Sequence, residues 1–364
     1  MKFISIVGAR PQFIKAAPVS ATLKNAGHQE VLVHTGQHYD DNMSKVFFED
    51  LNIKKPDVDL KVGSGPHGEQ TGRMLIGIEK VLIKHKPDRV LVYGDTNSTL
   101  AGSLAAVKLR IPIAHIEAGL RSYNPRMPEE HNRKVSDHLA DLLFCPTQEA
   151  LQNLSSEGIR HGIYLVGDVM YDSVLQNIQQ AENHSGILEK LNLNTKGYAL
   201  ATVHRAENTD LQERLVSIFH AFEQIAADGI QVVIPLHPRT RNKIEALGIS
   251  VRGPILIEPV SYLDMLLLEK NARIILTDSG GMQKEAYFFN VPCVTLRAET
   301  EWLELIAMGY NVLAGSNSEN IYNSYQLMIE KSFSFQPNLY GDGQAAEKIV
   351  DIIETDNTQH SDFN

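Results

Sequence analysis

Short apolar runs alternate with longer amphipathic segments along most of this chain. Each run ends in turn-forming or polar residues and is followed by a stretch long enough for a helix. This alternation predicts parallel strands joined by helices that cover both faces of a sheet. The predicted strands are 3–7, 31–34, 90–93, 113–116, 142–145, 164–166, 198–203, 232–236, 255–257, 274–276 and 294–296.

The alternation is interrupted once, near the middle of the chain. A helical pattern begins at Gly167 and runs to about Glu182, and the polar stretch Asn183–Lys196 reads as a connection. A length of 364 residues also favours two domains. We therefore predict an α/β protein of two Rossmann-like, doubly wound parallel-sheet domains. The predicted divisions are residues 1–170 and 171–355, followed by a loose tail at 356–364. For the final helix over 343–354, packing on the first domain is the alternative.

Composition narrows the class of partner. Hydrophobic residues make up 43% and charged residues 21%, as in globular proteins. The net charge of −10 argues against a broad nucleic-acid or anionic-membrane surface, so a bound anion needs a local group of cations. Cys145 and Cys293 lie in apolar runs, as buried free thiols do, which favours a reducing cytoplasm; no pattern supports a disulfide between them. The apolar run at the N-terminus is too short for a signal peptide or membrane span.

The strongest single motif follows the strand 274–276. Ser279 is placed to cap the next helix, and Gly280 and Gly281 let a ligand approach the backbone. Such a helix start offers unpaired N–H groups and a positive dipole end, which suit phosphate. Glu285, one turn inside the helix, is placed to accept hydrogen bonds from ribose hydroxyls. An ordinary serine-capped turn remains the alternative.

Histidine and arginine side chains follow two other strands of the second half. The strand 198–203 leads into His204 and Arg205, and the strand 232–236 leads into His237. Carboxyl ends of parallel strands share one edge of a sheet, so we expect these residues to face the same crevice as Ser279. No histidine pair has convincing metal-ligand spacing; His34 and His38 are four apart across a turn, so no metal is predicted.

The first half begins with a turn that does not fit a dinucleotide. Gly8-Ala9-Arg10-Pro11-Gln12 lacks the Gly-x-Gly-x-x-Gly pattern, and we expect no NAD and no other cofactor. Arg10 and Lys15 lie beside the helix start, where they can meet a pyrophosphate, although solvated side chains are the alternative.

Carboxylates follow the next strands of the first half. Asp95 follows the strand 90–93, Glu117 follows the strand 113–116, and a loop with two prolines leads to Glu129. The alternative role of Asp95 is to cap the following helix. Several carboxylates at one sheet edge can divide acid and base roles between them.

Taken together, these motifs resemble the non-hydrolysing UDP-N-acetylglucosamine 2-epimerases from Ile4 to about Gly315. The resemblance implies an active site in a cleft between two domains of the glycosyltransferase-B type, a homodimer, a UDP-sugar substrate, and a role in cell-surface polysaccharide synthesis. Its motifs are 8–12, 94–96, 115–121, 128–130, 204–205, 237–238 and 278–281. By position it assigns catalysis to Asp95, Glu117 and Glu129, and UDP binding to Arg10, Lys15, His204, Ser279, Gly280, Gly281 and Glu285. Because they end strands at the same crevice, we add His204 to the catalytic set, and Arg205 and His237 to the UDP-binding set.

The chain departs from the family pattern in two places. Gln37-His38-Tyr39-Asp40 replaces a Gln-His-Arg segment tied to allosteric activation by substrate. Glu301-Trp302-Leu303 replaces Glu-Arg-Pro and is similar to the branch acting on UDP-2,3-diacetamido-2,3-dideoxyglucuronate. The resemblance therefore leaves the sugar open between these two.

The chemistry that the family name implies fits the residue types. Epimerisation inverts C2 of the sugar, and no neighbouring carbonyl activates the proton on C2. We therefore expect UDP to leave C1 while a base removes that proton, and UDP then to add back to the unsaturated sugar. This route needs a cationic site for the diphosphate and carboxyl groups in different protonation states. A hydrolysing epimerase, a UDP-sugar glycosyltransferase and a non-catalytic sensor remain as alternatives.

Overall fold

A computed structural model describes residues 1–37, 54–331 and 339–361, except the side chains of Arg10 and of residues 357–361. The chain forms two compact units. The first contains Met1–Leu175 and Gln336–Asn364, and the second contains Gln176–Phe335. Both ends of the chain therefore belong to the first unit.

The first unit is built on a seven-stranded parallel sheet of order β3-β2-β1-β4-β5-β6-β7. From β1 the chain moves outward in one direction to β2 and β3, then returns to β4 and moves outward in the other direction. The topological switch point therefore lies between β1 and β4. The strands are β1 Lys2–Val7, β2 Gln29–His34, β3 Val58–Asp59, β4 Arg89–Tyr93, β5 Ile113–Ile116, β6 Leu142–Cys145 and β7 Ile163–Leu165.

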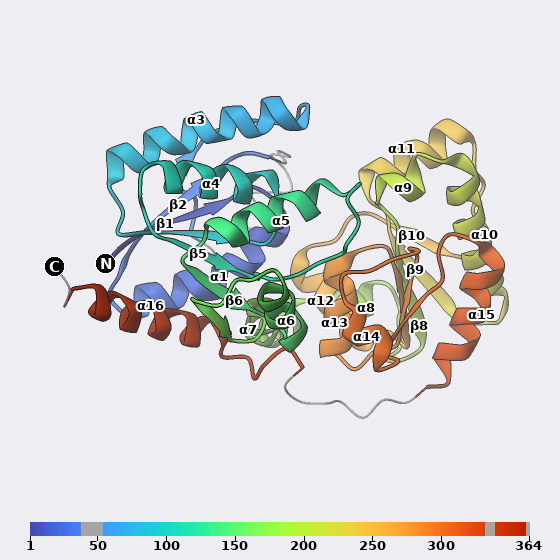
Figure 1. The fold of residues 1–364 in the computed structure, drawn as a ribbon. Coiled ribbons are helices and arrows are strands. Elements are labelled where there is room, and N and C mark those ends of the chain that lie inside the picture. The colour runs from blue at the N-terminus through green and yellow to red at the C-terminus, as the bar shows by residue number, and fades with distance from the viewer. Residues whose placement is uncertain (38–53, 332–338, 362–364) are drawn as a thin grey trace. The chain divides into compact units, whose positions relative to one another are not determined.

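Helices cover both faces of this sheet. Figure 1 shows α3, α4 and α5 on one face and α1 and α16 on the other. The first face is packed by aliphatic side chains such as Ile6, Val92, Met74 and Ile78, all fully buried. The chain passes from the first unit into the second within helix α7. The helices are α1 Arg10–Asn25, α3 His67–His85, α4 Asn97–Lys108, α5 Pro128–Leu139, α6 Gln148–Ser156, α7 Val169–His184 and α16 Ala345–Ser361.

The second unit contains a six-stranded parallel sheet of order β10-β9-β8-β11-β12-β13. Its switch point lies between β8 and β11, where Thr202 pairs with Thr277 in register. The strands are β8 Tyr198–Thr202, β9 Gln231–Pro235, β10 Ile255–Ile257, β11 Ile274–Thr277, β12 Cys293–Thr295 and β13 Asn311–Leu313.

Two groups of helices enclose the second sheet. In Figure 1, α12, α13 and α14 lie on one side of it, and α10 and α15 on the other. Phe219, Phe222 and Tyr325 pack on the strands from the α10–α15 side. The helices are α8 Ile187–Lys190, α9 Ala206–Thr209, α10 Gln212–Ala227, α11 Pro238–Leu247, α12 Tyr262–Asn271, α13 Gly280–Phe288, α14 Leu303–Ala307 and α15 Ser318–Ile329.

The predicted fold class is confirmed by these two parallel sheets, and all eleven predicted strands are present within one or two residues of their expected bounds. The structure adds β3, β13 and, inside the expected connection, the short helix α8. The boundary between the two units lies within α7, whereas the sequence places it at 170/171. The final helix belongs to the first unit and extends to Ser361, past the predicted start of the tail at residue 356.

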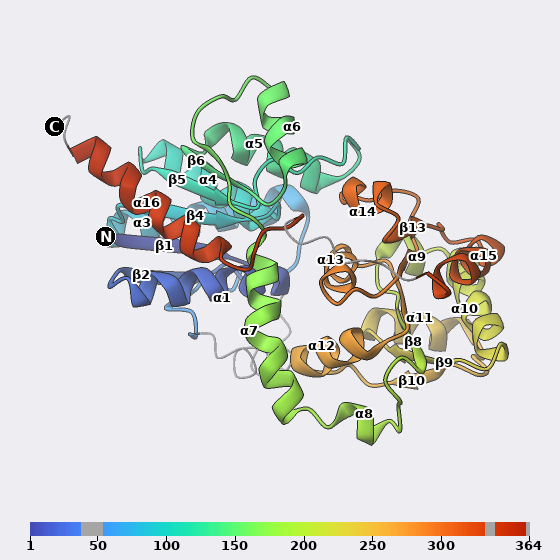
Figure 2. The same cartoon turned by 90° about the horizontal axis from the view of Figure 1, so that it is seen from below.

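Figure 2, seen from below, shows α16 lying alongside α1. Cys145 and Cys293 are buried free thiols, as predicted. None of the helices in the described part of the chain combines the length and hydropathy that a bilayer crossing requires.

Candidate functional site

Each unit places polar side chains just beyond the strands at its switch point. In the first unit, Gly8 follows β1 and Asp95 follows β4 after one residue. In the second unit, His204 lies two residues beyond β8, and Ser279 lies two residues beyond β11. Ligands of open α/β sheets bind outside these strand ends, so each unit has its candidate site where the sequence predicts it.

In the first unit, Lys15 and Glu117 meet. The Lys15 ammonium donates a hydrogen bond to the Glu117 carboxylate, and both side chains are largely buried. Glu117 has a φ of 68°, in the left-handed region that non-glycine residues seldom adopt. Its carboxylate lies against Gly94, where a Cβ would come within 3.1 Å of Glu117 Oε2. The structure thus brings together one residue predicted for UDP binding and one predicted for catalysis.

Asp95 is fixed from helix α5. Arg133 donates to the Asp95 carboxylate, and Asn132 Nδ2 donates to the Asp95 backbone oxygen at 3.0 Å. The N-cap of the following helix is Thr96, so the alternative role of Asp95 as a helix cap is wrong. Glu129 lies half-buried in the first turn of α5.

The turn after β1 is held by Gln12. Its Oε1 accepts hydrogen bonds from the Gly8 and Ala9 amides, and its Nε2 donates to the Tyr93 carbonyl at 2.7 Å. This contact ties the turn after β1 to the end of β4. Helix α1 begins at Arg10, but the Arg10 side chain lies outside the described residues.

Of the segment Gln37–Asp40, only Gln37 is described, and its Oε1 accepts from Ser98 Oγ at 2.8 Å. His38, Tyr39 and Asp40 lie outside the described residues, so the expectations that concern them stay predictions.

In the second unit, Ser279 caps helix α13, as predicted. Its hydroxyl accepts from the Met282 amide at 3.5 Å. Ser279, Gly280 and Gly281 are half-buried, so the first turn of α13 faces solvent in part. This geometry leaves the N-terminal amides and the positive end of the dipole available to an anion.

Asp278, just before that cap, organises the loop after β8. Its buried carboxylate accepts from the backbone amides of His204 and Arg205 at 3.0–3.1 Å and from Asn208 Nδ2 at 3.1 Å. The His204 ring nitrogen Nδ1 lies 3.2 Å from Asp278 Oδ1. Burial by itself would raise the pKa of Asp278, but the contacts with His204, Arg205 and Asn208 hold it below its ordinary value. The carboxylate therefore orients His204 beside the α13 turn.

The other predicted residues of the second unit gather around the same turn. The rings of His204 and His237 are 5.7 Å apart, and His237 is the N-cap of α11. A Cβ built on Gly280 would lie 3.9 Å from Arg205 Nη2, which places Arg205 beside this turn. Glu285 is buried, and its Oε1 accepts from the Tyr262 hydroxyl at 3.4 Å.

The segment Glu301-Trp302-Leu303 lies beside the α13 turn as well. A Cβ on Gly280 would be 3.6 Å from Trp302 Nε1 and 3.9 Å from Glu301 Oε2. On its other side, the Trp302 ring receives the buried Lys284 ammonium 4.2 Å from its centroid. Trp302, which departs from the family pattern, thus lies beside the first turn of α13 together with Glu301.

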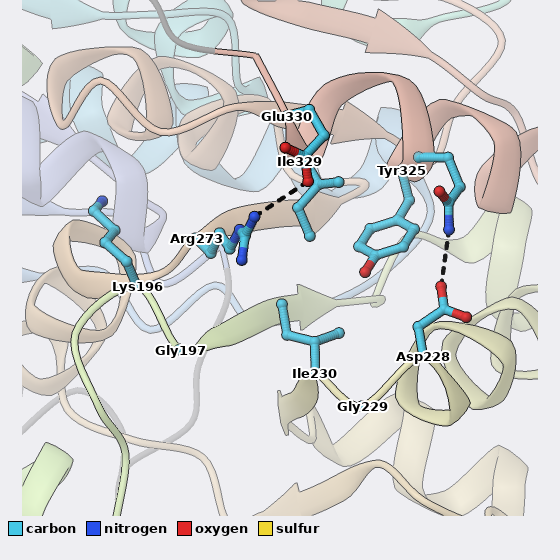
Figure 3. A pocket seen from close by; sticks show the side chains of 10 residues that line it. Lys196, Gly197, Asp228, Gly229, Ile230, Arg273, Tyr325, Ile329 and Glu330 are labelled. Carbon is cyan, nitrogen blue, oxygen red and sulfur yellow. Dashed lines mark hydrogen bonds and ion pairs between the residues drawn. The ribbon is translucent and has the colours of Figure 1, made fainter.

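A separate surface pocket of about 440 Å³ lies elsewhere in the second unit (Figure 3). Its lining includes Gly197, Ile230 and Arg273, which directly precede β8, β9 and β11. These are the amino ends of the strands, at the edge of the sheet opposite His204 and Ser279. Arg273 pairs there with Glu330 at 3.3 Å. We therefore assign the candidate site to the carboxyl ends and not to this pocket.

Several functional side chains were not singled out from the sequence. They are Gln12, Asn132, Arg133, Asp137 and Asp278, and all are buried and hydrogen-bonded to predicted site residues or their loops. The available signal was the polarity of α5, whose positions 130, 133 and 137 repeat on one helix face.

The fold and these strand-end groups define the class of protein: a two-unit α/β protein with a serine-capped helix start in one unit and partnered carboxylates in the other. The model of the UDP-N-acetylglucosamine 2-epimerase family matches residues 21–354. This chain belongs to that family.

Two relatives are similar to this chain over nearly its whole length. The UDP-2,3-diacetamido-2,3-dideoxy-D-glucuronate 2-epimerase of Pseudomonas aeruginosa is 52% identical, over 97% of this chain and 99% of its own. The Methanocaldococcus jannaschii UDP-GlcNAc 2-epimerase, crystallised in complex with UDP-GlcNAc and UDP, is 45% identical with a TM-score of 0.91, over 98% of this chain and 100% of its own. A spinosyn rhamnosyltransferase, 13% identical with a TM-score of 0.55 over 97% of this chain and 96% of its own, shares the fold alone.

Proposed function

We propose that this protein inverts C2 of UDP-N-acetylglucosamine to give UDP-N-acetylmannosamine, without net hydrolysis. The observation that carries the proposal is the pairing of two kinds of site. The helix start at Ser279 suits a diphosphate, and the carboxyl ends of β4 and β5 in the first unit carry the carboxylates Asp95 and Glu117. The M. jannaschii relative, crystallised with UDP-GlcNAc and UDP, supports the same class of substrate.

The proposed reaction is an elimination followed by an addition. A carboxylate removes the C2 proton, the C2–H electron pair forms the C1–C2 double bond, and the C1–O bond breaks with its electrons leaving on UDP. UDP then adds back to C1 while a carboxylic acid delivers a proton to the opposite face of C2. No net oxidation occurs, and the one proton removed from C2 is matched by the one proton returned to it.

The residues divide into two proposed roles. Asp95, Glu117 and Glu129 exchange protons with the sugar, with His204 beside the leaving oxygen. The diphosphate and uridine are held by positive groups and by the helix start, which stabilise the charge that develops on UDP as it leaves. These residues are Arg10, Lys15, His204, Arg205, His237, Ser279, Gly280, Gly281 and Glu285.

A second candidate substrate is UDP-2,3-diacetamido-2,3-dideoxyglucuronate. It is favoured by Glu301-Trp302-Leu303 beside the anion-binding turn and by the 52% identity to the P. aeruginosa relative of that name. The same residues would catalyse the same elimination and addition. This sugar carries a carboxylate at C6 where N-acetylglucosamine has a hydroxymethyl group.

The test is incubation of the protein with each nucleotide sugar in D₂O, followed by proton NMR. We expect product with deuterium at C2, because the returning proton comes from an acid that exchanges with solvent. A trace of free UDP and unsaturated sugar should accumulate slowly. Retention of the original hydrogen at C2 would overturn elimination, and stoichiometric free N-acetylmannosamine would identify a hydrolysing enzyme. Turnover of the diacetamido sugar alone would select the second candidate.

The proposal also covers the compartment, the oligomeric state and the pathway of the protein. We infer a cytoplasmic homodimer that supplies an activated sugar for cell-surface polysaccharide. The two buried free thiols fit a reducing compartment. Sedimentation at several protein concentrations tests the dimer.

A further inference from the structure

Helix α5 carries a buried carboxylate that does not lie at a strand end. Asp137 is fully enclosed and accepts hydrogen bonds from one group of β5 and two groups of the loop after β5. The donors are His115 Nδ1 at 2.7 Å, the Gly119 amide at 3.2 Å and Arg121 Nη1 at 2.7 Å. Burial by itself would raise the pKa of Asp137, but His115 and Arg121 hold it below its ordinary value. Asp137 is therefore an ionised acceptor for the whole loop.

His115 extends this contact to the neighbouring strand. Its second ring nitrogen, Nε2, lies 2.7 Å from the Gly94 carbonyl oxygen, the residue just before Asp95. His115 therefore bridges two oxygen acceptors, the Asp137 carboxylate and the Gly94 carbonyl. The Arg121 guanidinium lies between two carboxylates, Asp137 and Glu157, and Glu157 accepts from it at 2.6–2.7 Å.

Glu117 lies in the middle of the loop that Asp137 holds. His115 precedes it by two residues and Gly119 follows it by two, and both donate to the same carboxylate. Glu117 is in the left-handed backbone region, with a φ of 68°. A non-glycine residue stays in this region only when its surroundings fix it there. The loop also packs closely against α6 at Gly119, since a Cβ there would meet the Ala150 carbonyl oxygen at 2.3 Å.

We propose that Asp137 is the positioning residue for both candidate acid–base carboxylates. It fixes the backbone on either side of Glu117 directly and the backbone before Asp95 through His115. It does not itself exchange protons with the sugar. This inference rests on the proposed function, because it assigns roles to Glu117 and Asp95 in that reaction.

The test compares Asp137→Asn with Glu157→Gln. The asparagine keeps the volume of the side chain but turns an N–H₂ group toward at least one of three donors. Glu157→Gln alters the outer partner of Arg121 and leaves all contacts of Asp137 in place. Turnover is measured per UDP-binding site, counted by calorimetry, so that loss of folded protein does not enter the result.

For Asp137→Asn we expect kcat to fall roughly 10²-fold, the effect of displacing a catalytic group by about 1 Å. KM should change little. The fraction of turnovers that release free UDP and unsaturated sugar should rise, because slower reprotonation leaves the intermediate more time to escape. A purely structural role would lower the number of UDP-binding sites and leave both kcat per site and the leaked fraction unchanged. Glu157→Gln should resemble the wild type.

An Asp137→Asn protein with wild-type kcat per site and wild-type leakage would overturn the inference. If that variant does not fold, His115→Gln takes its place. This change cuts the link to Gly94 and keeps Gly119 and Arg121 on Asp137, and it should raise leakage in the same way; wild-type leakage would overturn the inference. If the wild type turns over neither sugar, the proposed function has failed. A crystal structure of Asp137→Asn then decides the positioning role: Glu117 unmoved against Lys15 refutes it, and a displaced loop supports it.

Discussion

The carboxylates at the strand ends each contact a basic side chain. Glu117 contacts Lys15, Asp95 contacts Arg133, and Asp278 contacts His204. A buried or half-buried carboxylate is costly unless it is paired and hydrogen-bonded, so these partners let acidic groups gather where a ligand is expected. The pairs also fix the direction in which each carboxylate points.

Replacing one oxygen of a catalytic carboxylate tests its role without emptying its space. We expect Glu117→Gln and Asp95→Asn each to reduce turnover by about 10²–10⁴-fold, the usual contribution of general acid–base catalysis. UDP affinity should change little, because the amide still accepts from the cationic partner and the helix start at Ser279 is intact. Epimer formation by NMR and UDP calorimetry measure the two effects.

The matched control for that pair is Glu149→Gln, an exposed carboxylate in the first turn of α6. It should leave turnover unchanged. Near-normal activity in the Glu117 variant would reduce Glu117 to a structural partner of Lys15.

Residue types at strand ends were readable from the sequence, but their partners were not. Glu117 follows an apolar run, and its position at the edge of a sheet follows from that alone. Its contact with Lys15 joins residues 102 positions apart, and no local pattern specifies which cation reaches which acid. Asp137 was missed because the inward face of α5 is built from polar and charged residues while Val135 is exposed, so a search for apolar periodicity points away from it.

At the scale of elements, α5 and α16 perform different tasks in the first unit. Helix α5 holds the loops after β4 and β5 through Asn132, Arg133 and Asp137. Helix α16 closes the opposite face, and its first turn is capped from another helix: Asp172 of α7 accepts from the Ala346 amide at 2.7 Å. This cap is buried, and burial together with nearby Asp168 and Asp342 raises the pKa of Asp172 to about 6.

That raised pKa predicts a pH-dependent stability. In the folded chain the Asp172 proton is held more tightly than in the unfolded chain, so ionisation costs stability as pH rises from about 4 through 6. Asparagine caps a helix as well as aspartate does and carries no charge. We therefore expect Asp172→Asn to stabilise the first unit by about 1–3 kcal/mol at pH 8, with a smaller gain at pH 5.

Urea denaturation at the two pH values measures this difference. Asp351→Asn serves as the control, because Asp351 is an exposed carboxylate on the same helix α16. Its effect on stability should be small and the same at both pH values. A gain for Asp172→Asn that is equal at pH 5 and pH 8 would contradict the assignment.

The elements that the sequence did not predict share a physical cause. Strand β3 has only two residues, and β13 is a three-residue edge strand with one fully buried position. Such strands bury too little apolar surface to produce a run. Helix α8 is a single turn inside a polar stretch. The long central strands, buried on both faces, were predicted closely because burial on both faces demands a continuous apolar run.

At the scale of the whole molecule, the first unit is assembled from both ends of the chain. Ile349, Val350 and Ile353 of α16 are fully buried, and Asp356 pairs with the buried Arg89 at 2.5 Å. Each buried aliphatic side chain contributes about 1.5–3 kcal/mol, against a total stability of about 5–15 kcal/mol for a typical domain.

Removing residues 345–364 should therefore destabilise the first unit selectively. The truncation exposes the apolar surface under α16 and leaves Arg89 without Asp356. Limited proteolysis with mass spectrometry should show cleavage across the first unit while residues 176–335 persist. A chain ending at Ser361 keeps the whole helix and is the control. Equal protease resistance of the two chains would show that α16 is dispensable.

The return of the chain to its starting unit also sets an order of events during synthesis. A ribosome adds about 5–20 residues per second, and domains of most proteins fold as they emerge, the N-terminal one first. Here the second unit is complete once Phe335 has emerged, whereas the first still lacks α16. The nascent chain must therefore carry an unfinished N-terminal unit, with the apolar face beside α1 uncovered, until α16 has also emerged. The unit begun first is closed only after the second unit has been made.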